Sequence, residues 1–213
     1  MGLKQRQERE REAVSRSILD AARELFVAEG YSNVSIRKIA EKIEYSPAAI
    51  YSYFASKDDI FLALAEEGFR LLFASTGDCE PKENRVETIR AGFWHLYDFS
   101  KQHPEYFSLM FVDRSVPRIS QDWQRFGFVR EMKKRIAELI GEAIANGDFP
   151  AGTQPDGVFR ILNAAIMGVA VMRLCDRLAP GEDADALARD TLNAALTGLR
   201  AGITHTFHPI QCE

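Results

Sequence analysis

The chain has few cysteines and no long hydrophobic run. Cys79, Cys175 and Cys212 are far apart and odd in number, which fits neither a disulfide framework nor a metal-binding spacing. The longest uninterrupted apolar stretch, Ala164–Met172, falls far short of the ~20 residues that a membrane span needs. No apolar run follows the highly charged segment Met1–Glu12, so no secretory signal is visible. We therefore expect reduced thiols, no membrane partner and a cytoplasmic protein.

The sequence also lacks the motifs of catalysis and of metal binding. It contains no Gly-rich phosphate loop and no His/Cys cluster with metal-ligand spacing. His95 and Asp98 are three residues apart on an expected helix and could pair, but no nucleophile or second base stands at a recognisable spacing from them. The prediction is a protein that is not an enzyme and has no cofactor and no metal.

The net charge of −4 is unevenly placed along the chain. From the N-terminus to Lys57 the balance is mildly positive, so the remainder carries the negative charge. Such an asymmetry suits a contact with nucleic acid that is confined to one end. The basic arm Lys4–Arg16 is expected to add contacts to phosphates.

Helical periodicity runs through almost the whole chain, and no convincing strand alternation is present. The first helix is expected to end at Gly30, and Ser35, Ser46 and Ser56 are good N-caps for three helices that follow. Further helices are expected at about 83–101, 105–111, 121–145, 156–178 and 183–203. This pattern predicts an all-α fold of about nine helices, with an N-terminal domain at 1–66 and a C-terminal domain at 67–213.

Two short helices joined through Glu44–Ser46 predict a helix-turn-helix. In that motif the second helix enters the major groove of DNA. In the predicted second helix, Pro47–Phe54, Ile50 and Phe54 would face the core and leave small residues and tyrosines for DNA. Alternatively, the tyrosines are packing residues and the basic pair before the turn is a solvated face.

The order of these elements resembles the DNA-binding domain of the TetR family of regulators over Ile18–Leu64. The matching features are Ala21-Ala22, Leu25-Phe26, Glu29-Gly30-Tyr31, Ser35-Ile36, Ile39-Ala40 and Ile50-Tyr51-x-Tyr53-Phe54-x-Ser56-Lys57. Glu44-Tyr45 stands where the family typically has Gly-Val, and Ala48 where glycine is frequent. The resemblance implies a homodimer that binds a palindromic double-stranded DNA operator.

DNA contacts are expected from residues of the helix-turn-helix and its flanks. The tyrosine hydroxyls, the lysine and the arginine suit phosphate oxygens, and the small residues allow the backbone to approach the bases. The resemblance together with the residue types gives Ser35, Arg37, Ser46, Pro47, Ala48, Ala49, Tyr51, Ser52, Tyr53 and Lys57.

The C-terminal domain is expected to bind a small molecule. Its segment Phe93–Arg114 resembles a subgroup of TetR-family ligand-binding domains in which an aromatic helix ends at a His-Pro pair. Its many aromatic and thioether side chains favour an apolar pocket with a few polar groups; alternatively, they form a plain hydrophobic core. The candidate ligand residues are Phe93, Tyr97, His103, Met110, Phe111, Trp123, Phe126, Asn163 and Met167.

The last two expected helices are rich in small residues, which allow helices to approach closely. These residues are Ala164, Ala165, Gly168, Ala170, Ala188, Ala194, Ala195, Gly198 and Ala201. They predict a homodimer through a four-helix bundle; alternatively, they serve a helix pair within one chain. Taken together, the sequence predicts a ligand-responsive regulator, most simply a repressor that an apolar effector releases from its operator. An activator and a helical interaction protein that has lost DNA binding are the alternatives.

Overall fold

The computed structural model describes residues 3–74, 84–117 and 124–202. In these ranges the chain forms nine α-helices, one 3-10 turn and one π-helical turn, and no strand, so the all-α prediction is confirmed. The chain divides into two compact units: residues 1–71 with 103–126, and residues 72–102 with 127–213. The division falls inside one helix, α4 (Lys57–Ala74).

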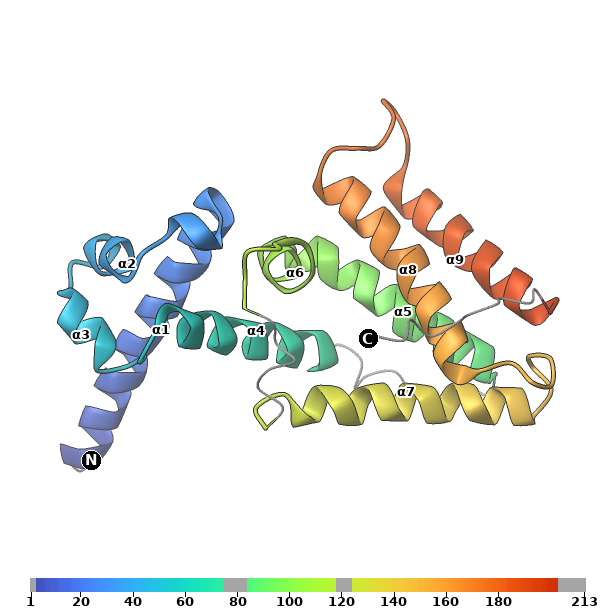
Figure 1. Ribbon diagram of the computed structural model, residues 1–213, viewed down its shortest axis with the longest axis horizontal. Coiled ribbons are helices and arrows are strands. Elements are labelled where there is room, and N and C mark those ends of the chain that lie inside the picture. Colours follow the sequence, from blue (N-terminus) through green and yellow to red (C-terminus); the bar gives the residue numbers. More distant parts are fainter. Residues whose placement is uncertain (1–2, 75–83, 118–123, 203–213) are drawn as a thin grey trace, which may run out of the picture. The chain divides into compact units, whose positions relative to one another are not determined.

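The first unit holds the predicted helix-turn-helix. Its elements are α1 (Leu3–Glu29), a 3-10 turn (Tyr31–Asn33), α2 (Ile36–Lys42), α3 (Pro47–Tyr51), most of α4, α6 (Pro104–Phe107) and a π-helical turn (Ser108–Val112). Helix α1 packs against α2, and α2 packs against α3 (Figure 1). Helix α6 also packs against α1, so this unit contains a segment far along the chain that the sequence had assigned to residues 67–213. The functional division at residue 66 stays a prediction, because the units are defined by packing alone.

Side-chain caps begin the short helices where the sequence places them. The Ser35 hydroxyl accepts a hydrogen bond from the Lys38 N–H at 3.2 Å, and the Ser46 hydroxyl accepts one from the Ala49 N–H at 3.1 Å. Pro47 occupies the first helical position of α3, where a missing N–H costs nothing. Each cap satisfies one of the N–H groups that a helix leaves unpaired at its start.

Two helices end earlier than their patterns predict. Helix α3 ends at Tyr51 rather than near Phe54, because the N–H groups of Ser52 and Tyr53 bond carbonyls only three residues back, at 3.1 and 2.9 Å. Helix α8 ends at Leu174 rather than near residue 178, because Asp176 takes a left-handed conformation with φ of 51°. A side-chain periodicity does not reveal either backbone change.

The second unit is a helical bundle. It comprises the end of α4, α5 (Arg85–Gln102), α7 (Gly127–Ala145), α8 (Pro155–Leu174) and α9 (Ala184–Arg200). Helix α8 packs against α5, α7 and α9, and Figure 1 shows α8 and α9 side by side. The bundle core includes Phe93, Tyr97, Ile140, Leu162 and Leu192, all of them buried.

Among the described residues, one helix is long and apolar enough to cross a membrane by length and composition, and it is α8. Only 28% of its most apolar window is buried within the single chain. The helix nevertheless packs against three neighbours in the bundle, and Ile166 and Leu162 on its inner face are fully covered.

Candidate functional site

The turn between α2 and α3 is closed by two hydrogen bonds. The Tyr45 N–H donates to the Ala40 carbonyl at 2.9 Å, and the Glu44 N–H donates to the Glu41 carbonyl at 3.3 Å. This pattern is a Schellman motif, and it requires a left-handed residue between the helix and its exit. Glu44 is that residue, with φ of 59°. The turn therefore has the geometry that glycine favours although its sequence carries a glutamate.

The residues predicted to contact DNA lie on the surface of the first unit. Helix α3 is held by Ile50, which is fully buried, so that its other faces are turned outward. Tyr51 is 55% exposed, the largest exposure among the exposed large hydrophobic side chains in the described part of the chain. Among the residues predicted to contact DNA, the exposed ones are Ser35, Arg37, Ser46, Pro47, Ala48, Tyr51 and Ser52. The half-buried ones are Ala49, Tyr53 and Lys57.

The two charged side chains among these residues, Lys57 and Arg37, have partners within the protein. The Lys57 ammonium donates to the carbonyls of Tyr31 and Val34 at 2.8 and 2.9 Å and lies 4.1 Å from the centre of the Tyr31 ring. The Arg37 guanidinium pairs with Glu41 at 2.8 Å. Because Lys57 uses two of its three donors inside the fold, it holds α4 against the turn after α1.

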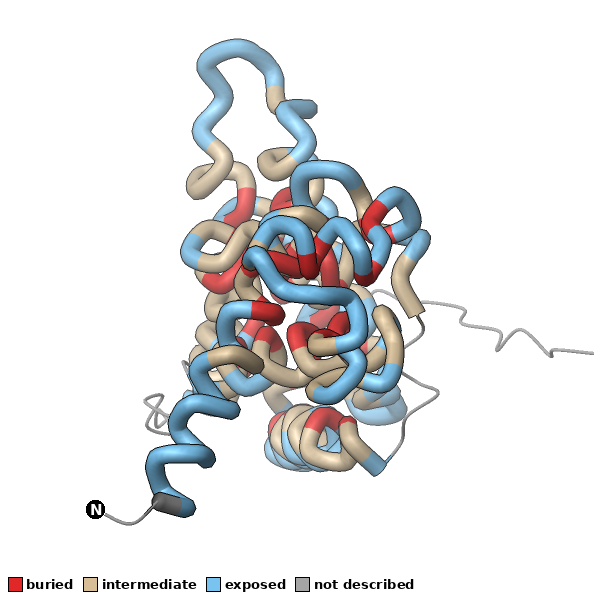
Figure 2. Tube along the Cα trace, turned by 90° about the vertical axis from the view of Figure 1, so that its left-hand side faces the viewer, coloured by how far each residue is buried: buried red, intermediate tan, exposed pale blue. Residues whose placement is uncertain are grey.

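The N-terminal arm is helical, and it extends the first helix beyond its core-facing part. Its residues 4–13 are exposed, as the N-terminal turns of α1 show in Figure 2. Arg11 of this arm contacts the end of α3: its guanidinium donates to the Ser52 carbonyl at 3.4 Å and lies 5.6 Å from the centre of the Tyr53 ring. Sequence reasoning assigned the arm only to phosphates and missed this contact, because it joins residues 41 positions apart.

A polar network joins three helices of the first unit. Arg16 of α1 donates twice to Glu67 of α4, at 2.8 and 2.9 Å, and Arg23 donates to the Tyr106 hydroxyl of α6 at 2.9 Å. Partial burial on its own raises the pKa of the Glu67 carboxyl, but hydrogen bonds from Arg16 and Tyr106 outweigh it and hold that pKa below its ordinary value. Gly68 lets α4 approach α6 closely, since a Cβ there would lie 3.0 Å from the Tyr106 ring.

The predicted ligand residues are divided between the two units. Phe93, Tyr97, Asn163 and Met167 belong to the bundle of the second unit, whereas the remaining described ones belong to the first unit. Those of the first unit are His103, Met110, Phe111 and Phe126, and Trp123 lies outside the described residues.

Several of these side chains have structural roles. Phe93 stacks at a tilt on Phe159 with ring centres 5.7 Å apart. The buried Tyr97 hydroxyl donates to Asp185 at 2.9 Å, and burial with this bond raises the pKa of Tyr97. A second bond to Asp185 comes from Lys101 at 2.9 Å, and these partners lower the pKa of the Asp185 carboxyl. A ligand role for the predicted residues stays a prediction.

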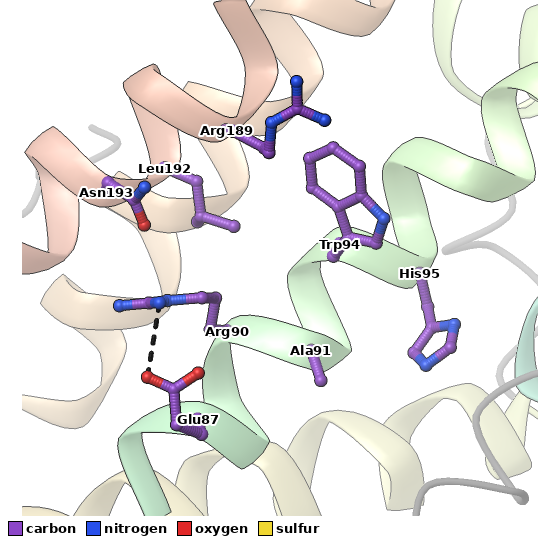
Figure 3. Close-up of a pocket in the computed structure, with 8 residues that line it drawn as sticks. All are labelled: Glu87, Arg90, Ala91, Trp94, His95, Arg189, Leu192 and Asn193. Carbon is purple, nitrogen blue, oxygen red and sulfur yellow. Dashed lines mark ion pairs between the residues drawn. The ribbon is translucent and has the colours of Figure 1, made fainter. Parts of the chain in front are cut away.

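The structure also forms a cavity, lined by both charged and apolar side chains, that the sequence did not predict. It is a cavity of about 290 Å³ in the second unit, between α5 and α9. It is lined by Glu87, Arg90, Ala91, Trp94, His95, Arg189, Leu192 and Asn193 (Figure 3). The only signal in the sequence was the i, i+4 spacing of Arg90 and Trp94, which puts both on one helix face.

Within the described ranges, no group of three or more His, Cys, Asp or Glu side chains is placed to hold a metal ion. Asp98, which the sequence could pair with His95, lies 3.5 Å from the Lys101 ammonium. Cys175 is a free, exposed thiol, and the other two cysteines lie outside the described residues.

An exposed second helix on a capped helix-turn-helix, carried by a three-helix core, defines a DNA-binding domain. Residues 18–64 match the family model described as "Bacterial regulatory proteins, tetR family". The chain is 39% identical over 147 residues to the HTH-type transcriptional regulator TcmR of Streptomyces glaucescens, covering 65% of this chain and 62% of TcmR. It is 40% identical over 50 residues to the HTH-type transcriptional repressor AcnR of Corynebacterium diphtheriae, covering 24% of this chain and 26% of AcnR. Residues 18–64 therefore form a DNA-binding domain of the TetR-family type.

The fold agrees with this family. The transcriptional regulator FadR of Bacillus subtilis, solved in complex with stearoyl-CoA, matches with a TM-score of 0.68 and 18% identity over 89% of this chain and 99% of that structure. The curated relatives are matched over only part of their length, 35% for the regulator YuxN of Bacillus subtilis and 62% for TcmR. These relatives are transcriptional regulators, and no enzyme family is indicated.

Proposed function

We propose that the protein is a transcriptional repressor that binds a palindromic DNA operator as a homodimer and is released from it by a small, largely apolar effector. The observation that carries this proposal is the helix-turn-helix, in which α3 is anchored by the buried Ile50 and presents Tyr51 outward. Transcriptional repressors among the relatives support it.

The proposed DNA interface uses α3 as the recognition helix. Pro47 and Ala48 are exposed and have short side chains, so the backbone of α3 can approach the base edges. The Tyr51 hydroxyl is free to reach a phosphate, and Arg37 can exchange its exposed partner Glu41 for one. A phosphate contact from Lys57 would use its third donor.

The proposed dimer forms through α8 and α9. Their small residues serve two purposes: Ala170 and Ala188 are buried where the two helices pack within one chain, whereas Ala164, Gly168 and Ala194 remain exposed. The exposed ones are spaced to let a second copy approach closely, which would give a two-fold four-helix bundle. This contact would also cover the apolar surface of α8, in keeping with a cytoplasmic protein.

The proposed effector binds among the aromatic and thioether side chains of the bundle, between Phe93 of α5 and Met167 of α8. It acts by differential affinity for two states of the dimer, with a coupling of about 1–3 kcal/mol that changes DNA affinity roughly 5–150-fold. FadR of Bacillus subtilis was solved with stearoyl-CoA, so long acyl compounds are the first probes. An effector that binds at saturation and leaves operator affinity unchanged contradicts this part of the proposal.

Selection from genomic DNA tests whether the protein binds a palindromic operator. Purified full-length protein is mixed with sheared genomic DNA, and the retained fragments are sequenced. We expect enrichment of a two-fold symmetric sequence whose half-sites are about one helical turn, ~34–36 Å, or a multiple of it apart. Retention of fragments without any shared sequence contradicts the proposal.

A further inference from the structure

We propose that the cavity between α5 and α9 is a binding site for a small aromatic carboxylate, separate from the apolar effector site. The cavity lies wholly within the second unit, and none of the predicted ligand residues lines it. Its volume of about 290 Å³ is at the lower end of the range for ligand pockets, which suits a single-ring molecule.

Two arginines give the cavity its positive charge. Arg90 pairs with Glu87 at 3.2 Å, whereas Arg189 forms no close ion pair within the described part of the chain and interacts with Asp185 only at longer range. Figure 3 shows Arg189 above the Trp94 ring and Arg90 extended below Leu192 and Asn193, so the two guanidinium groups flank the cavity. With one acid against two arginines, the lining favours an anion.

Arg90 also carries an unsatisfied donor. Its Nε is buried, and no described residue accepts a hydrogen bond from it. A buried donor without a partner destabilises the fold, so an acceptor oxygen that reaches it is stabilising. Because Glu87 pairs with Nη1, the edge formed by Nε and Nη2 is left for the two oxygens of a carboxylate, which would meet the buried Nε after a small rotation of the Arg90 side chain.

The rest of the cavity lining is suited to the flat apolar ring of a ligand. The Trp94 indole, Leu192 and Ala91 supply an apolar wall, and the Asn193 amide adds two N–H donors and a carbonyl acceptor. The Trp94 ring is itself supported by Tyr97, with ring centres 5.1 Å apart. A benzoate-like ligand would place its ring against this wall and its carboxylate between the arginines.

The experiment uses full-length protein and 4-fluorobenzoate, followed by fluorine NMR line broadening. We expect saturable binding with a dissociation constant of about 0.1–1 mM, as suits a ligand of this size. Arg189→Gln should weaken binding at least tenfold, whereas Arg135→Gln, which removes an exposed arginine from α7, should leave it unchanged. Neutral 4-fluorobenzamide should bind at least tenfold more weakly than the carboxylate.

Three results would overturn the proposal. One is the absence of saturable binding of 4-fluorobenzoate to the wild-type protein. Another is equal loss of binding in Arg189→Gln and Arg135→Gln, with both variants melting like the wild type in circular dichroism. The third is displacement by inorganic phosphate at equal concentration, which would show a site for any anion and not for an aromatic carboxylate.

Discussion

Arg16 and Glu67 join α1 to α4 through two hydrogen bonds, 2.8 Å from Nη1 and 2.9 Å from Nη2. The planar guanidinium matches both carboxylate oxygens, which makes such a pair stronger than a single contact. Arg16 is 47% exposed and Glu67 29%, so solvent screening reduces its contribution to about 1 kcal/mol. The pair fixes the helix that carries Lys57 to the helix that supports the DNA-binding domain.

We expect Glu67→Gln to lower the free energy of unfolding by about 1 kcal/mol at pH 7. The lowered pKa of Glu67 gives the sign of the pH dependence. The stabilisation is fully present above the unfolded pKa of about 4.3 and is lost as the pH falls through the lower folded value. Urea unfolding of the wild type and the variant at pH 7 and near pH 3 measures the loss of stability and its dependence on pH. Glu10→Gln, in an exposed pair with Arg6, is the control, and an equal effect of the two changes at pH 7 would contradict this account.

Glu44→Gly should stabilise the protein by about 0.5–1 kcal/mol, because a left-handed conformation costs a residue with a Cβ more than it costs glycine. Glu44→Ala keeps the Cβ and is expected to change the stability little. Thermal unfolding of both variants measures the difference. If alanine stabilises as much as glycine, the charge of Glu44 and not its backbone conformation sets its energetic effect.

Arg11→Ala should weaken operator binding several-fold through the loss of support for α3. Since the Arg11 guanidinium is bonded to Ser52 within the protein, the slope of log affinity against log salt should stay unchanged. Arg6→Ala, on the same exposed helix, is the comparison. A slope reduced by about 1 in Arg11→Ala would show that Arg11 leaves Ser52 for a phosphate.

Gly168→Ala tests the proposed dimer face. Within one chain a Cβ at Gly168 meets nothing within 4 Å. The methyl group would therefore stabilise an exposed helix by up to ~1 kcal/mol, but it would collide in a closely packed dimer. We expect at least a tenfold weaker dimer in sedimentation experiments. Gly92→Ala, at an exposed glycine of α5 whose Cβ would also meet no neighbour, should leave the dimer intact. Equal dimer affinity of the two variants would contradict a dimer contact through α8.

The sequence predicted those parts of the fold that local chemistry determines. Ser46-Pro47 marked the start of α3, and Gly30 marked the end of α1, because caps and left-handed glycines act within a few residues. The outward-facing residues of α3 followed from the expected burial of Ile50. The turn at Glu44 was harder to predict, since its left-handed conformation is held by hydrogen bonds and not by a glycine.

The residues of the proposed effector site could not be assigned in the same way. Aromatic composition does not say which core a side chain enters, and Met110 and Phe93 lie in different units. The cavity with Arg90 and Arg189 is formed by helices about a hundred residues apart in the chain, so only tertiary packing brings its residues together. The contact between Arg11 and Ser52 was missed for the same reason.

Sequence-selective binding of DNA through α3 is tested most directly by fluorescence anisotropy. The labelled fragment most enriched in the genomic selection is titrated with the wild type, Tyr51→Phe and Tyr51→Ala. We expect the wild type to bind it at least tenfold more tightly than random DNA, and both variants to bind more weakly, by about 0.5–1.5 kcal/mol for the loss of the hydroxyl alone. Equal affinity for the two DNAs, with no effect of either change, would contradict the account.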